Sequence, residues 1–195
     1  MMPVEGLGNP TAPAPIRLPL ERAEKFAQKI VGELQPFCSL DAGGLPAIAV
    51  AGSIRRRRPE VADIDIVCLP RDEAHREQIR ARALRTQPWI LQDGPMTLLV
   101  ILDTPLGPIQ LDLWFASHPD KHMFGETPGN WGSLLLLRTG SRRHNLWMLH
   151  QLAKRDLKWH TSTGVFKNGH CLASETEEEF FRILDSPFIA PEDRE

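Results

Sequence analysis

The sequence predicts a mixed α/β protein with a larger N-terminal lobe and a small C-terminal lobe. Apolar residues recur at helical spacing over 20–34, and short β-rich runs follow as far as residue 117. Beyond Ser117 a Gly/Pro-rich loop leads into two helical segments. Roughly 100–200 residues make one domain, so 195 residues suffice for one domain or two small lobes. We expect a flexible Pro-rich tail over 1–17 and lobes over 18–117 and 118–195.

Breakers and apolar spacing predict the individual elements. In the first lobe they predict a helix over 20–34 that Pro36 ends, strands over 45–51 and 64–69, a polar surface helix over 71–86, and a hairpin of 96–102 with 109–115. In the second lobe they predict helices over 133–138 and 145–155, strands over 157–160 and 164–166, and an acidic helix over 175–184 that Thr176 caps.

Charge and composition exclude several classes of protein. Lys and Arg total 23 against 25 Asp and Glu, so the chain lacks the strongly basic surface of a nucleic-acid coat. No apolar run approaches the roughly 18 residues of a membrane span, and the first twenty residues resemble no signal peptide. The three cysteines Cys38, Cys68 and Cys171 form no Cys-x-x-Cys pair, which argues against a disulfide framework or a zinc knuckle. We therefore expect a cytoplasmic protein with no membrane partner.

Three aspartates carry the chemistry expected of this chain. Asp63 and Asp65 stand two residues apart in a strand, so both point to one face while Ile64 and Ile66 point to the core. Asp112 lies on the polar face of a later strand. If the two strands pair, the three carboxylates converge, and such an all-oxygen cluster suits two Mg²⁺ ions of a phosphoryl-transfer site.

The turn before the first strand supplies donors for a phosphate. Gly52 lets the backbone approach a phosphate closely, Ser53 offers a hydroxyl at a helix start, and Arg55 and Arg56 add fork-shaped donors. Taken singly, an Asp-x-Asp pair is commonly a solvated strand edge, and a run of arginines is commonly a solvated turn. Their combination at this spacing favours a nucleotide site.

The segment 52–66 resembles the nucleotidyltransferase signature of the DNA polymerase X family, the relatives of DNA polymerase beta. Residues 138–145 resemble that family's Thr-Gly-Ser turn, with Asn145 four residues after the serine. Residues 188–195 resemble its terminal Pro-Glu-x-Arg-Glu. The resemblance spans 18–195 and is strongest to small stand-alone members from bacteria and phages. It implies a nucleotidyltransferase palm over 18–117 and a thumb- or fingers-like nucleotide-binding lobe over 118–195.

The resemblance implies a role for each matching residue. Asp63, Asp65 and Asp112 would be the catalytic carboxylates and hold two Mg²⁺ ions, with Mn²⁺ able to substitute. Gly52, Ser53 and Arg56 would bind the triphosphate, Thr139 and Gly140 would follow the sugar, and Asn145 would contact the base edge. A nucleoside monophosphate would pass from a nucleoside triphosphate to a DNA 3′-hydroxyl, with release of pyrophosphate.

The chain also departs from the family pattern. Leu137 and Arg138 stand where the family usually has aromatics beside the sugar, and Leu149 stands where an arginine lies near the template. The choice between dNTP and NTP and between templated and untemplated synthesis stays open. No region remains for the lyase or helix-hairpin-helix modules of larger members. We expect weak, salt-sensitive binding of a DNA primer or primer-template by a monomer, through the cationic residues Arg142, Arg143, Lys154 and Arg155.

Two alternatives to a minimal DNA polymerase stay open. The same chemistry could act on RNA, a protein hydroxyl or a small-molecule hydroxyl, or the chain could be a non-catalytic nucleotide- or DNA-binding module. The histidines show no metal-ligand spacing, and the tryptophans Trp131, Trp147 and Trp159 are more typical of a core than of a base-stacking surface.

Overall fold

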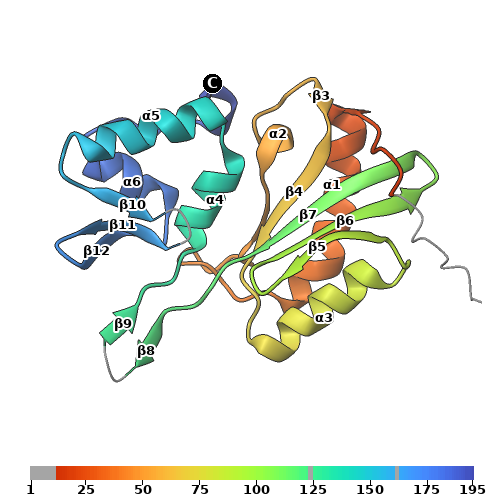
Figure 1. The fold of residues 1–195 in the computed structure, drawn as a ribbon, viewed down its shortest axis with the longest axis horizontal. Helices are drawn as coiled ribbons and strands as arrows, with labels where there is room; N and C mark the ends of the chain where they lie inside the picture. The colour runs from red at the N-terminus through yellow and green to blue at the C-terminus, as the bar shows by residue number, and fades with distance from the viewer. Residues whose placement is uncertain (1–11, 123–124, 161–162) are drawn as a thin grey trace, which may run out of the picture.

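The computed structural model describes residues 12–122, 125–160 and 163–195, and these form two lobes side by side (Figure 1). The mixed α/β fold class is confirmed. The helices are α1 (Leu20–Leu34), α2 (Gly52–Arg55), α3 (Glu73–Leu84), α4 (Trp131–Thr139), α5 (Arg142–Ala153) and α6 (Glu177–Ile183), with 3₁₀ turns η1 (Gln35–Phe37) and η2 (Pro191–Asp193). The strands are β1 (Leu18–Pro19), β2 (Ile48–Val50), β3 (Glu60–Val61), β4 (Asp63–Cys68), β5 (Trp89–Gly94), β6 (Thr97–Thr104), β7 (Gly107–Phe115), β8 (Asp120–His122), β9 (Gly125–Thr127), β10 (Lys158–His160), β11 (Gly164–Lys167) and β12 (His170–Ala173).

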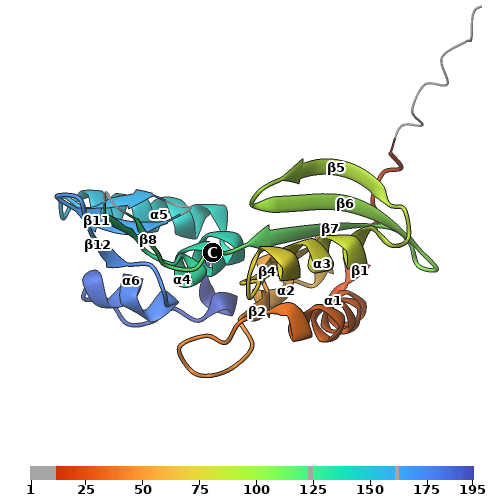
Figure 2. The same cartoon turned by 90° about the horizontal axis from the view of Figure 1, so that it is seen from below.

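The N-terminal lobe is built on a five-stranded sheet with the order β2-β4-β7-β6-β5. Strands β4 and β7 are parallel neighbours, and the other pairs are antiparallel. Helices α1 and α3 cover one face of the sheet, whereas β5 and β6 carry no helix on the other face (Figure 2). Because alternate residues of a strand face opposite ways, one face of β4 and β7 is free to hold polar groups.

The covered face of the sheet holds the main core of this lobe. Ile64 and Ile66 of β4 and Leu111 and Leu113 of β7 are almost completely buried there, against the apolar side of α1. Helix α1 begins and ends where the sequence predicts. The body of the lobe starts before the predicted boundary at residue 18, since the Ile16 amide donates to the Pro108 carbonyl at 2.8 Å. Residues 1–11 of the predicted tail lie outside the described residues.

The C-terminal lobe packs helices α4, α5 and α6 with the small sheet β10-β11-β12 around its own core. Helix α6 starts with a capping box, in which the Thr176 hydroxyl accepts from the Glu179 amide as predicted. A third apolar cluster joins the lobes, because Leu134 and Leu135 of α4 pack with Val67, Leu69 and Trp114 of the large sheet. Helix α4 therefore fixes the residues that follow it relative to β4 and β7.

Several elements differ from the sequence prediction. Strand β5 was not predicted, because its residues WILQDG show no apolar alternation and most are exposed. The short strands β8, β9 and β12 were also missed. The strand predicted over 45–51 is limited to Ile48–Val50, since Leu45 lies in an exposed loop. Among the described residues, no helix combines the length and the apolar composition that crossing a bilayer requires.

Candidate functional site

The three predicted carboxylates lie together on the open face of the parallel pair β4–β7. In its register Asp65 stands opposite Asp112, and Asp63 stands opposite Gln110. Asp112 is only 6% exposed, while Asp63 is half-buried. The pairing assumed from the sequence is thus present, and it places carboxylates side by side.

Burial and mutual repulsion make these carboxylates costly to ionise. Burial, followed by the charge of Asp63, raises the pKa of Asp65 to about 7, although a hydrogen bond from Trp114 opposes the shift. Burial also raises the pKa of Asp112, against a hydrogen bond from Gln110. A cation between the carboxylates would remove this cost, and three carboxylates form the oxygen donor set that Mg²⁺ prefers.

The orientation of the deeper carboxylates is set by neighbouring donors. Trp114 Nε1 donates to Asp65 Oδ1 at 3.1 Å, and Gln110 Nε2 donates to Asp112 Oδ1 at 2.9 Å. Within the described parts of the chain, no three His, Cys, Asp or Glu side chains are already arranged as a metal-binding group. The donor chemistry therefore fits a divalent cation, whereas the ligand geometry requires these side chains to rotate.

The turn at Gly52 and Ser53 lies directly beside Asp65. Gly52 has a φ of +57°, and a Cβ on it would lie 2.0 Å from Asp65 Oδ2, so only glycine fits there. The Ser53 hydroxyl is buried and has no hydrogen-bond partner in the structure. A buried donor without a partner is costly, and an incoming phosphate oxygen would satisfy it.

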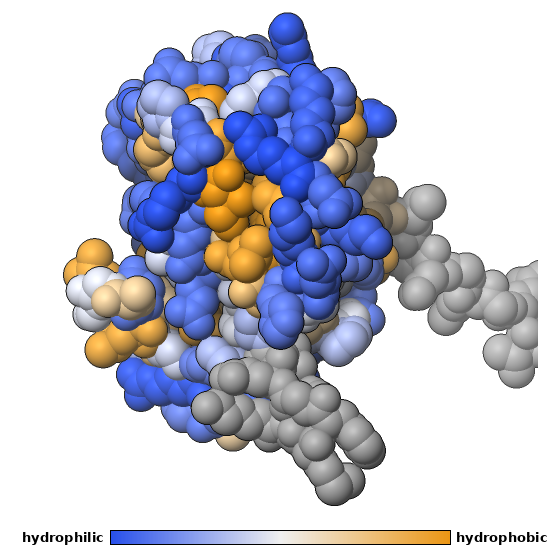
Figure 3. All heavy atoms as spheres, turned by 90° about the vertical axis from the view of Figure 1, so that its left-hand side faces the viewer, coloured by the Kyte–Doolittle hydropathy of each residue, from blue (hydrophilic) through white to orange (hydrophobic). Residues whose placement is uncertain are grey.

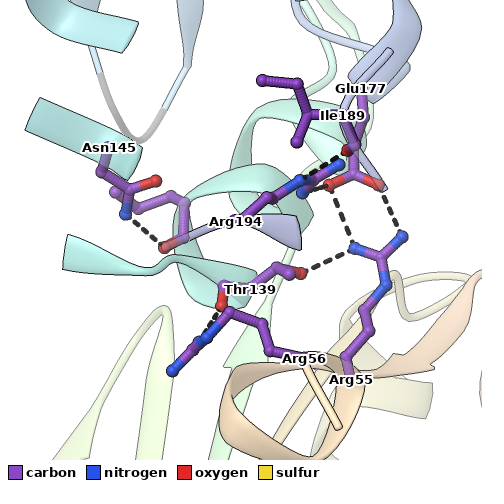
Figure 4. Close-up of polar contacts among 8 residues, drawn as sticks. Arg55, Arg56, Thr139, Asn145, Glu177, Ile189 and Arg194 are labelled. Carbon is purple, nitrogen blue, oxygen red and sulfur yellow. Dashed lines mark hydrogen bonds and ion pairs between the residues drawn. The ribbon is translucent and has the colours of Figure 1, made fainter. Parts of the chain in front are cut away.

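Arg56 lies between the carboxylates and the C-terminal end of α4. Its Nη1 donates to the Thr139 carbonyl oxygen, and its charge acts favourably on Asp65 and Asp63 (Figure 4). A Cβ on Gly140 would lie 3.1 Å from the same Nη1. Burial, followed by the neighbouring charge of Arg58, lowers the pKa of Arg56. The structure thus brings Arg56, Thr139 and Gly140 together, as the nucleotide-site prediction requires.

Arg55 does not face this site, contrary to its prediction as a phosphate donor. It binds Glu177 through both terminal nitrogens, at 3.0 and 2.5 Å, and donates to Thr139 Oγ1 at 2.6 Å (Figure 4). Glu177 also accepts from Arg194 at 2.6 Å, and Arg194 is completely buried. These three residues form an ion-pair network that joins the two lobes, and Arg55 is used in it.

Helix α5 presents the remaining predicted residues. Asn145 Nδ2 donates to the Leu137 carbonyl at 2.8 Å, and its Oδ1 is buried without a partner. The four predicted DNA-binding residues Arg142, Arg143, Lys154 and Arg155 are all exposed. They form two pairs at opposite ends of α5, about 18 Å apart at 1.5 Å per residue.

The two cationic pairs on α5 differ in how far they are free to bind a partner. Arg155 Nη2 donates to the Leu184 carbonyl at 2.8 Å, so this arginine has a structural role as well. Figure 3 views the C-terminal lobe from its outer side, where hydrophilic side chains surround a narrow apolar strip. Arg142 and Arg143 are therefore the predicted DNA-binding pair without such a structural contact among the described residues.

The sequence prediction missed the groups that orient the site. Gln110 and Trp114 each stand two residues from Asp112, so strand periodicity could have placed both on the carboxylate face. Glu177 was assigned only to a helix N-terminus, and no sequence signal indicated that it is buried between Arg55 and Arg194. That contact depends on how the lobes pack.

Residues 134–195 match the family model of the DNA polymerase beta thumb. The C-terminal lobe is thus similar to a polymerase beta thumb. The match supports a DNA polymerase beta-like assignment and agrees with the resemblance found in the sequence. The match begins within α4 and ends at the last residue, so all three carboxylates lie outside the matched part. No curated protein was found to match the chain.

Proposed function

We propose that this chain is a metal-dependent nucleotidyltransferase that adds nucleoside monophosphates from nucleoside triphosphates to a DNA 3′-hydroxyl. One observation carries the proposal. Three carboxylates share one face of the β4–β7 pair, next to the buried and unpartnered hydroxyl of Ser53. The adjoining C-terminal lobe matches the family model of the polymerase beta thumb. A polymerase thumb supports DNA as the polymer that is bound.

Divalent cations fit this donor set, and Asp63, Asp65 and Asp112 are the residues that would hold them. Two bound Mg²⁺ ions would neutralise charge on the transferring phosphoryl group and make the acceptor hydroxyl more acidic. The chain's own residues orient the reactants. The hydrogen bond from Gln110 orients Asp112. Because Asp112 lies on β7, the strand farther from Ser53, we assign it to the side of the site that would hold the acceptor hydroxyl.

The phosphate side of the site would be formed by the turn that carries Gly52. Ser53 would donate its hydroxyl to a phosphate oxygen, and the Arg56 guanidinium would bind the β- and γ-phosphates. Arg56 also contacts Thr139, so a nucleotide bound there would touch both lobes. Holding both reactants in line is the largest contribution that protein groups make to phosphoryl transfer.

A second acceptor class is favoured by the open face of the sheet. On the neighbouring strands, Asp112 of β7 stands opposite Leu99 of β6, and Leu99 stands opposite Gln92 of β5. In the same way, Gln110 stands opposite Ile101, and Ile101 stands opposite Trp89. Residues 87–117 contain no Lys, Arg or His. Because these strands offer no cation to hold a phosphate backbone, a small-molecule or protein hydroxyl becomes a competing acceptor to DNA.

A primer-extension assay tests the proposal. A labelled DNA primer, presented as gapped, recessed or single-stranded, is incubated with Mg²⁺ or Mn²⁺ and each nucleotide separately. We expect extension by the wild type and by Asp103→Asn, an exposed carboxylate on β6, and a loss of at least 10³-fold in Asp112→Asn. Addition of the complementary dNTP alone indicates templated synthesis, and addition of any dNTP indicates a terminal transferase.

The same assay separates the alternatives. Absence of extension on every DNA substrate, together with pyrophosphate release on an RNA, protein or small hydroxyl acceptor, would transfer the activity to the second class. Nucleotide binding without turnover on any acceptor, unchanged in Asp112→Asn, would identify a non-catalytic binding module and refute the proposal.

A further inference from the structure

Arg138 is a cation placed beside the carboxylates without being paired to one of them. It lies in the last turn of α4, and its guanidinium carbon is 3.2 Å from the centroid of the Trp114 ring. Across the described residues, no Asp or Glu oxygen lies within ion-pair distance of it. Its partner is an aromatic face, which holds the guanidinium by a cation–π contact without forming an ion pair.

The ring that holds Arg138 also holds the carboxylate cluster. Trp114 Nε1 donates to Asp65 Oδ1 at 3.1 Å while the face of the ring carries the guanidinium. The charge of Arg138 acts favourably on both Asp65 and Asp112. Arg138 Nε is buried without a hydrogen-bond partner. One tryptophan thus fixes a cation and a carboxylate at a set separation.

A fixed positive charge at this position acts oppositely on the two ligands of the proposed reaction. It repels a divalent cation that approaches the carboxylates, and it attracts the phosphates of a nucleotide. Because the site is largely buried, both effects are screened less than they would be at the surface.

We propose that Arg138 makes metal binding depend on nucleotide binding. The Arg138 charge weakens binding of a divalent cation alone, and the negative charge of the triphosphate removes that penalty when both bind together. The inference rests on the proposed function for the identity of the two ligands. It adds that the site binds metal more weakly without nucleotide, and it assigns this difference in affinity to Arg138.

Direct metal titration tests the proposal without measuring turnover. Free Mn²⁺ is followed by electron paramagnetic resonance as the full chain is titrated, with and without a nonhydrolysable nucleoside triphosphate analogue. Arg138→Gln removes the charge and keeps most of the length, whereas Arg138→Lys keeps the charge. Arg182→Gln, which changes an exposed arginine of α6, is the matched control.

We expect Arg138→Gln to bind Mn²⁺ alone on the order of tenfold more tightly than the wild type. Its gain in Mn²⁺ affinity on adding the analogue should shrink by a similar factor. Arg138→Lys and Arg182→Gln should behave as the wild type. Arg138→Met, which keeps the aliphatic stem, replaces the Gln variant if that variant does not fold.

Two results would overturn the inference. One is that the neutral variant binds Mn²⁺ alone no more tightly than the wild type. The other is that the analogue increases Mn²⁺ affinity equally in both. In either case, a wild type that still binds Mn²⁺ and nucleotide leaves the proposed function standing. A wild type that binds no Mn²⁺ under any condition refutes the proposed function as well.

Discussion

Asp65→Asn should stabilise this protein at alkaline pH while removing its metal site. The Asp65 pKa is about 7 in the folded chain against an ordinary 3.8, so between these pH values the folded state holds a proton that the unfolded state has lost. The free energy of unfolding therefore falls as pH rises through this range. The shift is worth about 4 kcal/mol at pH 8 and roughly 2 kcal/mol at pH 5. Asparagine avoids this cost and still accepts from Trp114.

Urea unfolding in a chelating buffer at pH 5 and pH 8 measures the effect. We expect Asp65→Asn to exceed the wild type in free energy of unfolding by a margin that grows with pH. Asp103→Asn should not differ from the wild type at either pH, because Asp103 is exposed. Mg²⁺ added at pH 8 together with a nonhydrolysable nucleoside triphosphate analogue should stabilise only chains that keep Asp65. A margin that is zero at pH 8, or equal at both pH values, would show that Asp65 is not held neutral by its surroundings.

Other substitutions test separate parts of the site. Gly52→Ala should lose about 2 kcal/mol or more and most of its metal affinity, because the new Cβ would lie 2.0 Å from Asp65 Oδ2; urea unfolding and Mn²⁺ titration check this. Ser53→Ala should raise the free energy of unfolding by about 1 kcal/mol, since the buried hydroxyl has no partner, and weaken nucleotide binding about tenfold in a fluorescence titration. Glu177→Gln should lose about 3 kcal/mol in urea unfolding, because Arg194 would remain buried without a carboxylate. Unchanged stability in Glu177→Gln would show that the interlobe network contributes nothing.

The segment that follows Ser53 contacts both the proposed phosphate site and the C-terminal lobe. Arg55 and Arg56 are adjacent at the C-terminal end of α2, yet Arg55 binds Glu177 and Arg56 binds the Thr139 carbonyl of the C-terminal lobe. Arg58 forms a further ion pair with the terminal residue Glu195. The same short segment therefore carries the proposed phosphate donors and contacts between the two lobes.

Much of this architecture could be predicted from local pattern. Helix α1 follows from apolar spacing and a closing proline, and Thr176 was identified as the cap of α6. The carboxylates could be placed on one face because strand periodicity is strict. Strand β5 could not be predicted, because it lies at the edge of the sheet with both faces exposed and so has no apolar alternation.

By itself, the sequence determined which groups are present and which face of each strand they occupy, because those properties depend on side-chain chemistry and backbone period. Only the tertiary structure decided which of these side chains contact one another. Arg55 and Arg56 are equivalent in sequence, and packing of α4 and α6 against α2 separated their roles. Trp114 reads as an apolar strand residue, yet parallel pairing of β4 with β7 brings its N–H to Asp65 and its ring to Arg138. Contacts between distant segments depend on how the elements pack, and local pattern carries little information about that.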